Sequence, residues 1–233
     1  MLPTDCLHSL TVDFGHAPAP VRAAFEFSAD ELSGFLCQAG RDEVPLLLLC
    51  TSSALYLVST SESHVRAFRP VLASILDRVR HVDGWRALPV RAASGSDAAR
   101  CLLNQAIPSS GFEPEVRQFV TELRAAAERS HSWGAFSTEL AALTRMTEHA
   151  AARVWDETRL GRPGSSEAEL ELETLVAERI LEEELVAWQS SYPAVRSSRR
   201  PISDPNLLPF EGEERHSMIR LRAASVLSKL GTG

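Results

Sequence analysis

The stretch Leu46-Leu47-Leu48-Leu49-Cys50-Thr51-Ser52-Ser53-Ala54-Leu55-Tyr56-Leu57-Val58 decides the fold of this chain. Two apolar runs of strand length flank the polar turn Thr51-Ser52-Ser53, so the stretch predicts two buried strands at about residues 44–50 and 54–59. The thiol of Cys50 stands where the first strand meets the turn. A free cysteine is usually a small buried core residue, but it is also a nucleophile where a base or cation lowers its pKa. Both interpretations of Cys50 stay open on these residues alone.

The residues around this hairpin alternate between strand and helix patterns. Leu10, Val12 and Phe14 alternate with other residues, as in a half-buried strand. The other predicted elements are a helix opened by the capping box of Ser28 and Glu31 and ended by Gly40, a helix over 64–80 that contains Pro70, and a short strand at 88–90. The order β-α-β-β-α-β predicts a ferredoxin-like split βαβ sandwich over residues 1–95.

The remainder of the chain has helical periodicity. Helices are predicted over 98–106, 113–130, 135–158, 167–188 and 213–230, with a loop over 192–209 that contains Arg196, Arg199 and Arg200. The break Gly161–Ser166 predicts a boundary between a domain over 1–162, whose helical part is 96–162, and a helical region over 167–233. The predicted fold class is therefore α+β. The two last helices are amphipathic and cannot bury both their own faces well, which predicts docking, most simply in a homodimer.

Composition narrows the class of protein. The net charge of -7 and the 6% aromatic content argue against bulk attraction to nucleic acid and against a base-stacking surface, so no DNA partner is predicted. No run approaches the ~20 apolar residues that span a bilayer, and the start of the chain, with Asp5, lacks a signal-peptide pattern. The four cysteines are scattered without metal-ligand spacing. These features predict a cytoplasmic protein without a membrane partner or a bound metal.

Three segments carry a resemblance to one enzyme family through their order and spacing. They are Val12–Arg22 with Phe27-Ser28 and Glu31-Leu32, then Cys50–Tyr56, then Gly111–Gln118 with Ala151–Thr158 and Gly161-Arg162. They are similar to N-H-K-T-A-P-x-x-x-R, to C-N-R-x-E-I-Y, and to G-E-x-Q-I-L-x-Q with A-x-R-V-R-x-E-T-x-I-G-R of glutamyl-tRNA reductase. That enzyme opens tetrapyrrole (porphyrin) biosynthesis from glutamate-charged tRNA. The last helices also resemble the family's C-terminal dimerisation region.

The resemblance implies a role for Cys50 and shows what this chain lacks. In the family the cysteine attacks the aminoacyl ester of charged tRNA to give a thioester, and an arginine holds the substrate carboxylate. That arginine position is Ser52 here, the motif glutamate is Ala54, and the family's proposed acid-base histidine is Cys101. His16 and Phe14 occupy the positions of the opening threonine and histidine. The candidate catalytic residue is Cys50, and the weak substrate-pocket candidates are His16, Thr51, Ser52 and Cys101.

The nucleotide-binding part of the family is also missing. Gly161-Arg162 is followed almost at once by the acidic helix, and no G-x-G-x-x-G follows a strand, so no cofactor is predicted and the chain should not reduce alone. Three functions follow as hypotheses. The first is a non-catalytic binding or regulatory homologue whose partner is an authentic glutamyl-tRNA reductase or an aminoacyl-tRNA. The second is an acyltransferase that passes an aminoacyl group from Cys50 to an acceptor other than hydride. The third, ranked last, is a split reductase that uses the NADPH domain of another chain.

Overall fold

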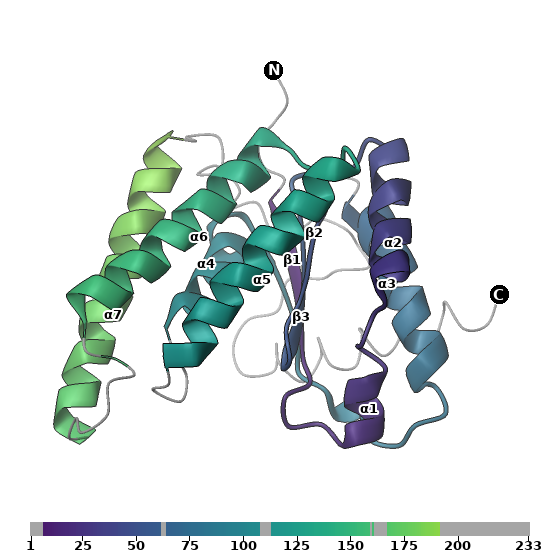
Figure 1. Cartoon of the computed structure of the whole chain (residues 1–233), viewed down its shortest axis with the longest axis horizontal. Helices are drawn as coiled ribbons and strands as arrows, with labels where there is room; N and C mark the ends of the chain where they lie inside the picture. Colours follow the sequence, from purple (N-terminus) through teal and green to yellow (C-terminus); the bar gives the residue numbers. More distant parts are fainter. Residues whose placement is uncertain (1–6, 62–63, 108–112, 159, 161–166, 192–233) are drawn as a thin grey trace.

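The computed structural model describes residues 7–61, 64–107, 113–158, 160 and 167–191 (Figure 1). Four strands are present in this part of the chain: β1 (His8–Asp13), β2 (Leu47–Cys50), β3 (Ala54–Ser59) and β4 (Val90–Ser94). The helices before β4 are α1 (Ala19–Ala23), α2 (Ala29–Arg41), α3 (His64–Val79) and the 3₁₀ turn η1 (Trp85–Ala87). Those after it are α4 (Gly95–Leu103), η2 (Asn104–Ala106), α5 (Glu113–Ser132), α6 (Thr138–Glu157) and α7 (Glu167–Ser191). The predicted α+β class is confirmed.

The four strands form one antiparallel sheet in the order β2-β3-β1-β4. Strands β1 and β3 lie in the centre, where Thr11 of β1 pairs with Tyr56 on one side and with Arg91 of β4 on the other. Strand β2 lies at the edge, and its last residue, Cys50, pairs with Leu55. The hairpin predicted from Leu46 to Val58 is thus the β2–β3 pair.

Helices cover both faces of this sheet (Figure 1). Helices α2 and α3 lie on one face, helices α4 and α5 lie on the other, and α6 and α7 pack outside α4 and α5. Two apolar cores result, one on each face. Alternation along β2 sends Leu46 and Leu48 into the core beneath α2 and α3, while Leu47 and Leu49 enter the core beneath the later helices. Side chains of β3 alternate between the two cores, and all six of its residues are buried.

Local sequence signals explain where several helices begin. The Ser28 hydroxyl accepts a hydrogen bond from the Glu31 amide, and the Glu31 carboxylate accepts one from the Ser28 amide, so the predicted capping box is confirmed. The Ser137 hydroxyl caps α6 by accepting a single hydrogen bond from the Leu140 amide, at 3.2 Å. Pro70 lies inside α3 without ending it.

One close backbone contact joins the two helical layers. A Cβ atom built on Gly40, near the end of α2, would overlap the carbonyl oxygen of Trp133, which follows α5. By contrast, a Cβ on Gly34, earlier in the same helix, would have no atom within 4 Å. Gly40 is therefore needed for the close approach of α2 to the end of α5, a requirement that helix periodicity does not reveal.

Some predicted boundaries were wrong. The strand predicted at 88–90 begins instead at Val90 and runs to Ser94, because pairing with β1 extends it through residues of low strand propensity. The helix predicted at 98–106 begins at Gly95 and ends as an α-helix at Leu103, followed by the turn η2. The Pro-rich segment after β1 contains the short helix α1, which is not among the predicted elements. The predicted boundary at 161–166, the arginine cluster at 196–200 and the predicted helix 213–230 lie outside the described residues.

Helix α7 packs on α6 and α4 through apolar contacts and ion pairs. Ala177, Ile180, Leu181, Leu185 and Trp188 of α7 belong to the same core as the inner residues of α4–α6. Arg153 of α6 donates to Glu184 at 2.9 Å and to Glu183 at 3.1 Å, and His149 lies 3.0 Å from Glu184. Arg100 of α4 pairs with Glu182. Part of the acidic face of α7 therefore contacts basic side chains of α4 and α6.

Candidate functional site around Cys50

Cys50 ends β2 and its side chain lies on the face of the sheet covered by α1–α3. The residue is half-buried and packs against the core formed by residues such as Phe25 and Leu55. Its position follows from strand alternation, since Leu47 and Leu49 point to the opposite face. The predicted nucleophile is thus held on a strand end within an apolar layer.

The thiol of Cys50 is a hydrogen-bond donor. Its Sγ lies 3.2 Å from the carbonyl oxygen of Phe25 and 3.8 Å from that of Thr51. A carbonyl oxygen can only accept, so the sulfur keeps its proton in these contacts. Attack on an aminoacyl ester requires the opposite state, a thiolate that forms the C–S bond while the C–O bond to the tRNA ribose breaks.

The segment that supplies the Phe25 carbonyl is held in place by α3. The guanidinium of Arg78 donates to the carbonyl oxygen of Glu26 at 2.9 Å, pairs with the Glu31 carboxylate, and lies 5.0 Å over the ring of Phe27. Phe25 itself stacks on Phe14 with ring centroids 4.5 Å apart. The acceptor of the Cys50 proton is therefore part of the packed core.

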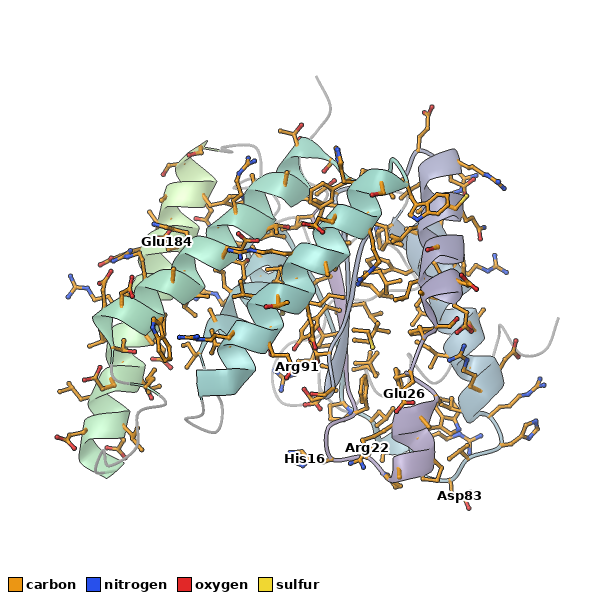
Figure 2. All side chains as sticks on the ribbon, in the orientation of Figure 1. His16, Arg22, Glu26, Asp83, Arg91 and Glu184 are labelled. Carbon is orange, nitrogen blue, oxygen red and sulfur yellow. The ribbon has the colours of Figure 1, made fainter. Side chains whose placement is uncertain are left out.

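Electrostatics also disfavour a thiolate at Cys50. Burial first, and then the carboxylates of Glu122 and Glu26, raise the pKa of the thiol from 9.0 to about 11, against a smaller lowering by Arg129. His16, a weak substrate-pocket candidate, and Arg22, the arginine of the opening motif, are both exposed. Both lie at the α1 end of the molecule (Figure 2). The charged side chains that shift the pKa of the thiol are Glu122, Glu26 and Arg129.

Thr51 and Ser52 belong to the turn and serve different purposes. The Thr51 hydroxyl accepts from the amides of Ala54 at 3.0 Å and Ser53 at 3.3 Å, and donates to the Ala54 carbonyl at 3.1 Å. The Thr51 hydroxyl therefore makes its hydrogen bonds within the turn and stabilises it. The Ser52 side chain is exposed. The turn is also fixed against the end of β1, because the Phe14 amide donates to the Ser53 carbonyl at 2.8 Å.

Cys101 lies on the other face of the sheet. It is a half-buried residue of α4, and its thiol interacts with Ser9 and Arg91. Burial raises the pKa of this thiol as well. The structure therefore brings Cys50, Thr51 and Ser52 together at one turn, leaves His16 exposed on a neighbouring loop, and separates Cys101 from Cys50 by the sheet.

The residues around Cys101 form a polar row that sequence inspection missed. Tyr56, Thr11 and Arg91 are paired neighbours across β3, β1 and β4. Burial first, and then Asp13 and Cys101, raise the pKa of Tyr56 well above its ordinary value. A signal was present: because Leu10, Val12 and Phe14 face one core, residues 9, 11 and 13 must face the other side, and all three are polar.

A small cavity found among the described residues is lined by neither Cys50 nor Cys101. This cavity of about 10 Å³ lies between η2, α5 and α6 and is lined by Ala106, Val116, Ala151, Val154, Trp155, Thr158 and Leu160. That volume accommodates about one water molecule. Within the described part of the chain, no three His, Cys, Asp or Glu side chains converge as metal ligands. No described helix combines the length and apolar character required to cross a membrane.

The fold and site define an α+β protein with a protonated cysteine at the end of an edge strand. No family model matches the sequence, and the comparison with curated proteins found no match. Among solved structures, the chain is similar to glutamyl-tRNA reductase from Methanopyrus kandleri, with a TM-score of 0.48 and 17% sequence identity. The similarity covers 79% of this chain and 47% of that one, so the chain matches about half the length of that enzyme.

Proposed function

We propose that this chain is a glutamyl-tRNA reductase-like protein, of tetrapyrrole-pathway ancestry, that binds or regulates instead of catalysing. The state of Cys50 carries the proposal. Its proton is directed at the Phe25 carbonyl at 3.2 Å, and burial with neighbouring carboxylates raises its pKa to about 11. A cysteine that forms a thioester at neutral pH needs a base or a cation that favours the thiolate.

The replaced motif positions support the same interpretation because they now serve packing and turn formation. Phe14, at the position of a family histidine, is 3% exposed and stacks on Phe25. Ala54, at the position of the motif glutamate, is 4% exposed. Ser52, at the position of the family arginine, cannot form the two parallel hydrogen bonds that a guanidinium donates to a carboxylate. Two of the replaced positions are therefore buried packing residues, and the third lacks the guanidinium that would bind a glutamyl carboxylate.

The scaffold belongs to the same proposal. We propose that residues 8–94 are a ferredoxin-like split βαβ unit, supported by the order of the elements and by the strand order β2-β3-β1-β4. The cytoplasmic location, the homodimer and the division at residues 161–166 stay predictions from the sequence. The proposed partner is an authentic glutamyl-tRNA reductase or a charged tRNA.

A covalent trapping experiment tests the absence of catalysis. The purified chain is incubated with tRNA charged with radiolabelled glutamate and quenched in acid, and label on protein is counted. An authentic glutamyl-tRNA reductase without NADPH is the positive control. We expect no more label on this chain than on its Cys50→Ser variant. Label that is present in the chain and in Cys101→Ser but lost in Cys50→Ser would establish the acyltransferase instead.

A binding experiment tests the positive half of the proposal. The chain is titrated into fluorescently labelled authentic glutamyl-tRNA reductase and, separately, into charged tRNA. A saturable complex with one of them is expected. Failure to bind both, at concentrations up to about 100 μM, would contradict a binding or regulatory role in this pathway.

A further inference from the structure

Helix α7 has two apolar faces on opposite sides. One face, Ala177, Ile180, Leu181, Leu185 and Trp188, is buried against α4 and α6. The other is exposed: Leu172 is 62% accessible, Leu175 61%, Val186 51% and Val176 37%. Counted from Leu172, spacings of three, four and fourteen residues put this second set on one side of the helix. We call Leu172, Leu175, Val176 and Val186 the outer strip of α7.

An exposed strip of this kind indicates a contact surface, because side chains of this size gain roughly 1.5–3 kcal/mol each when fully removed from water. Its surroundings restrict what could cover it. Residues 167–191 contain eight glutamates and one arginine. Glu171, Glu178 and Glu182 are exposed beside the strip, and Arg179 lies within it. A second copy of α7 would therefore place acidic residues against acidic residues, which disfavours pairing of two outer strips.

The chain itself contains a segment of complementary chemistry. Residues 213–230, predicted as an amphipathic helix, present Ile219, Ala223, Val226, Leu227 and Leu230 at helical spacing. The same segment contains four basic residues, Arg215, Arg220, Arg222 and Lys229, and two acidic ones, Glu213 and Glu214. The apolar stripe of this segment could pack on the apolar outer strip, and its basic residues are opposite in charge to the glutamates beside that strip.

The connection also permits this contact. Helix α7 ends at Ser191, and residues 192–212 separate it from the predicted helix. Such a connection spans up to roughly 70 Å when extended, whereas packed helices lie about 8–10 Å apart. A tether of this length gives an effective concentration on the order of millimolar, so the attached segment outcompetes a second chain at micromolar concentrations.

We infer that residues 213–230 dock on the outer strip of α7 within the same chain. The segment would complete a second helical layer outside α6 and α7 and cover Leu172, Leu175, Val176 and Val186. This inference requires neither a reactive Cys50 nor a tRNA or reductase partner, and it replaces the homodimer contact that the sequence predicted for residues 213–230.

Cysteine labelling of the full chain tests the docking. Leu175→Cys places a thiol in the strip, and Asp77→Cys places one on α3, where the Asp77 side chain is 74% exposed. A maleimide is added, and the labelling rate at each position is measured by peptide mass spectrometry, so the native cysteines stay in place. We expect labelling at position 175 to be at least about tenfold slower than at position 77, with the same ratio from about 1 to 100 μM protein.

A second variant identifies what covers the strip. Ile219→Asp with Leu227→Asp, added to Leu175→Cys, should raise the rate at position 175 to that at position 77. Protection that grows with protein concentration would show that a second copy covers the strip and would overturn the inference. Equal rates at both positions in the parent chain, or protection that survives the aspartate substitutions, would also overturn it.

Discussion

The rate of alkylation of Cys50 tests whether the folded protein raises the pKa of this thiol. The half-buried Cys50 thiol donates to the Phe25 carbonyl, and its pKa is raised from 9.0 to about 11. At pH 7.5 a thiol with a pKa of 9.0 is about 3% ionised, whereas one with a pKa of 11 is about 0.03% ionised. We therefore expect iodoacetamide to modify Cys50 about 100-fold more slowly than in the unfolded protein, before any further slowing by limited access.

The assay follows modification of the Cys50 peptide by mass spectrometry from about pH 7 to pH 11, with the protein in buffer and in urea as the matched pair. In the folded protein the rate should still rise with pH beyond 9, because the thiolate forms only there. Glu122→Gln should shift the profile to lower pH, since that carboxylate raises the pKa. A profile that levels off below pH 9 in the folded protein would refute the reasoning and would revive Cys50 as a nucleophile.

Three further perturbations test the packing, the ion pairs and a buried histidine. Gly40→Ala should cost about 1–3 kcal/mol of unfolding free energy in urea titrations because its Cβ overlaps a backbone carbonyl, whereas Gly34→Ala in the same helix should gain about 0.5–1 kcal/mol; equal effects would exclude the close contact. Arg153→Gln should cost about 1–2 kcal/mol because it leaves a half-buried carboxylate of α7 without its guanidinium, and Arg179→Gln, an exposed pair within one helix, less than about 0.5. A larger loss for Arg179→Gln than for Arg153→Gln would contradict this ranking. Burial, and then a neighbouring histidine, lower the pKa of His8 from 6.5 to about 4, so folding stability should fall by about 1–2 kcal/mol as the pH drops from 6.5 toward 4, where only the unfolded chain takes up the proton. His8→Phe should flatten that pH dependence, and an unchanged slope would contradict the assignment.

The architecture of the sheet was largely predictable because its signals are local. The apolar runs on both sides of Thr51–Ser53 predicted β2 and β3, and the capping box at Ser28 fixed the start of α2. Strand β4 was misplaced because its residues, from Val90 to Ser94, have little strand character of their own. They become a strand through pairing with β1, a long-range interaction that local patterns do not contain.

The candidate site was predictable in its parts but not in its assembly. The sequence located Cys50 at a strand end, and alternation with Leu49 was enough to assign its face. It could not show that the Phe25 carbonyl would take the thiol proton, because that contact joins residues 25 positions apart. Likewise, Cys101 was grouped with Cys50 through the family pattern, although α4 carries it to the opposite face of the sheet.

The core on the α4–α7 face has a consequence for how the protein is made. It joins Leu47, Leu49 and Tyr56 on the sheet to Trp188 near the end of α7. A ribosome that adds about 5–20 residues per second needs on the order of ten seconds to travel from β3 to that tryptophan. That side of the nascent hairpin lacks its direct cover until α4 and α5 have emerged, and the surfaces of α4 and α6 that pack on α7 stay uncovered until α7 follows. Newly synthesised chains should therefore bind chaperones until α7 emerges, and should aggregate when translation stops before residue 188.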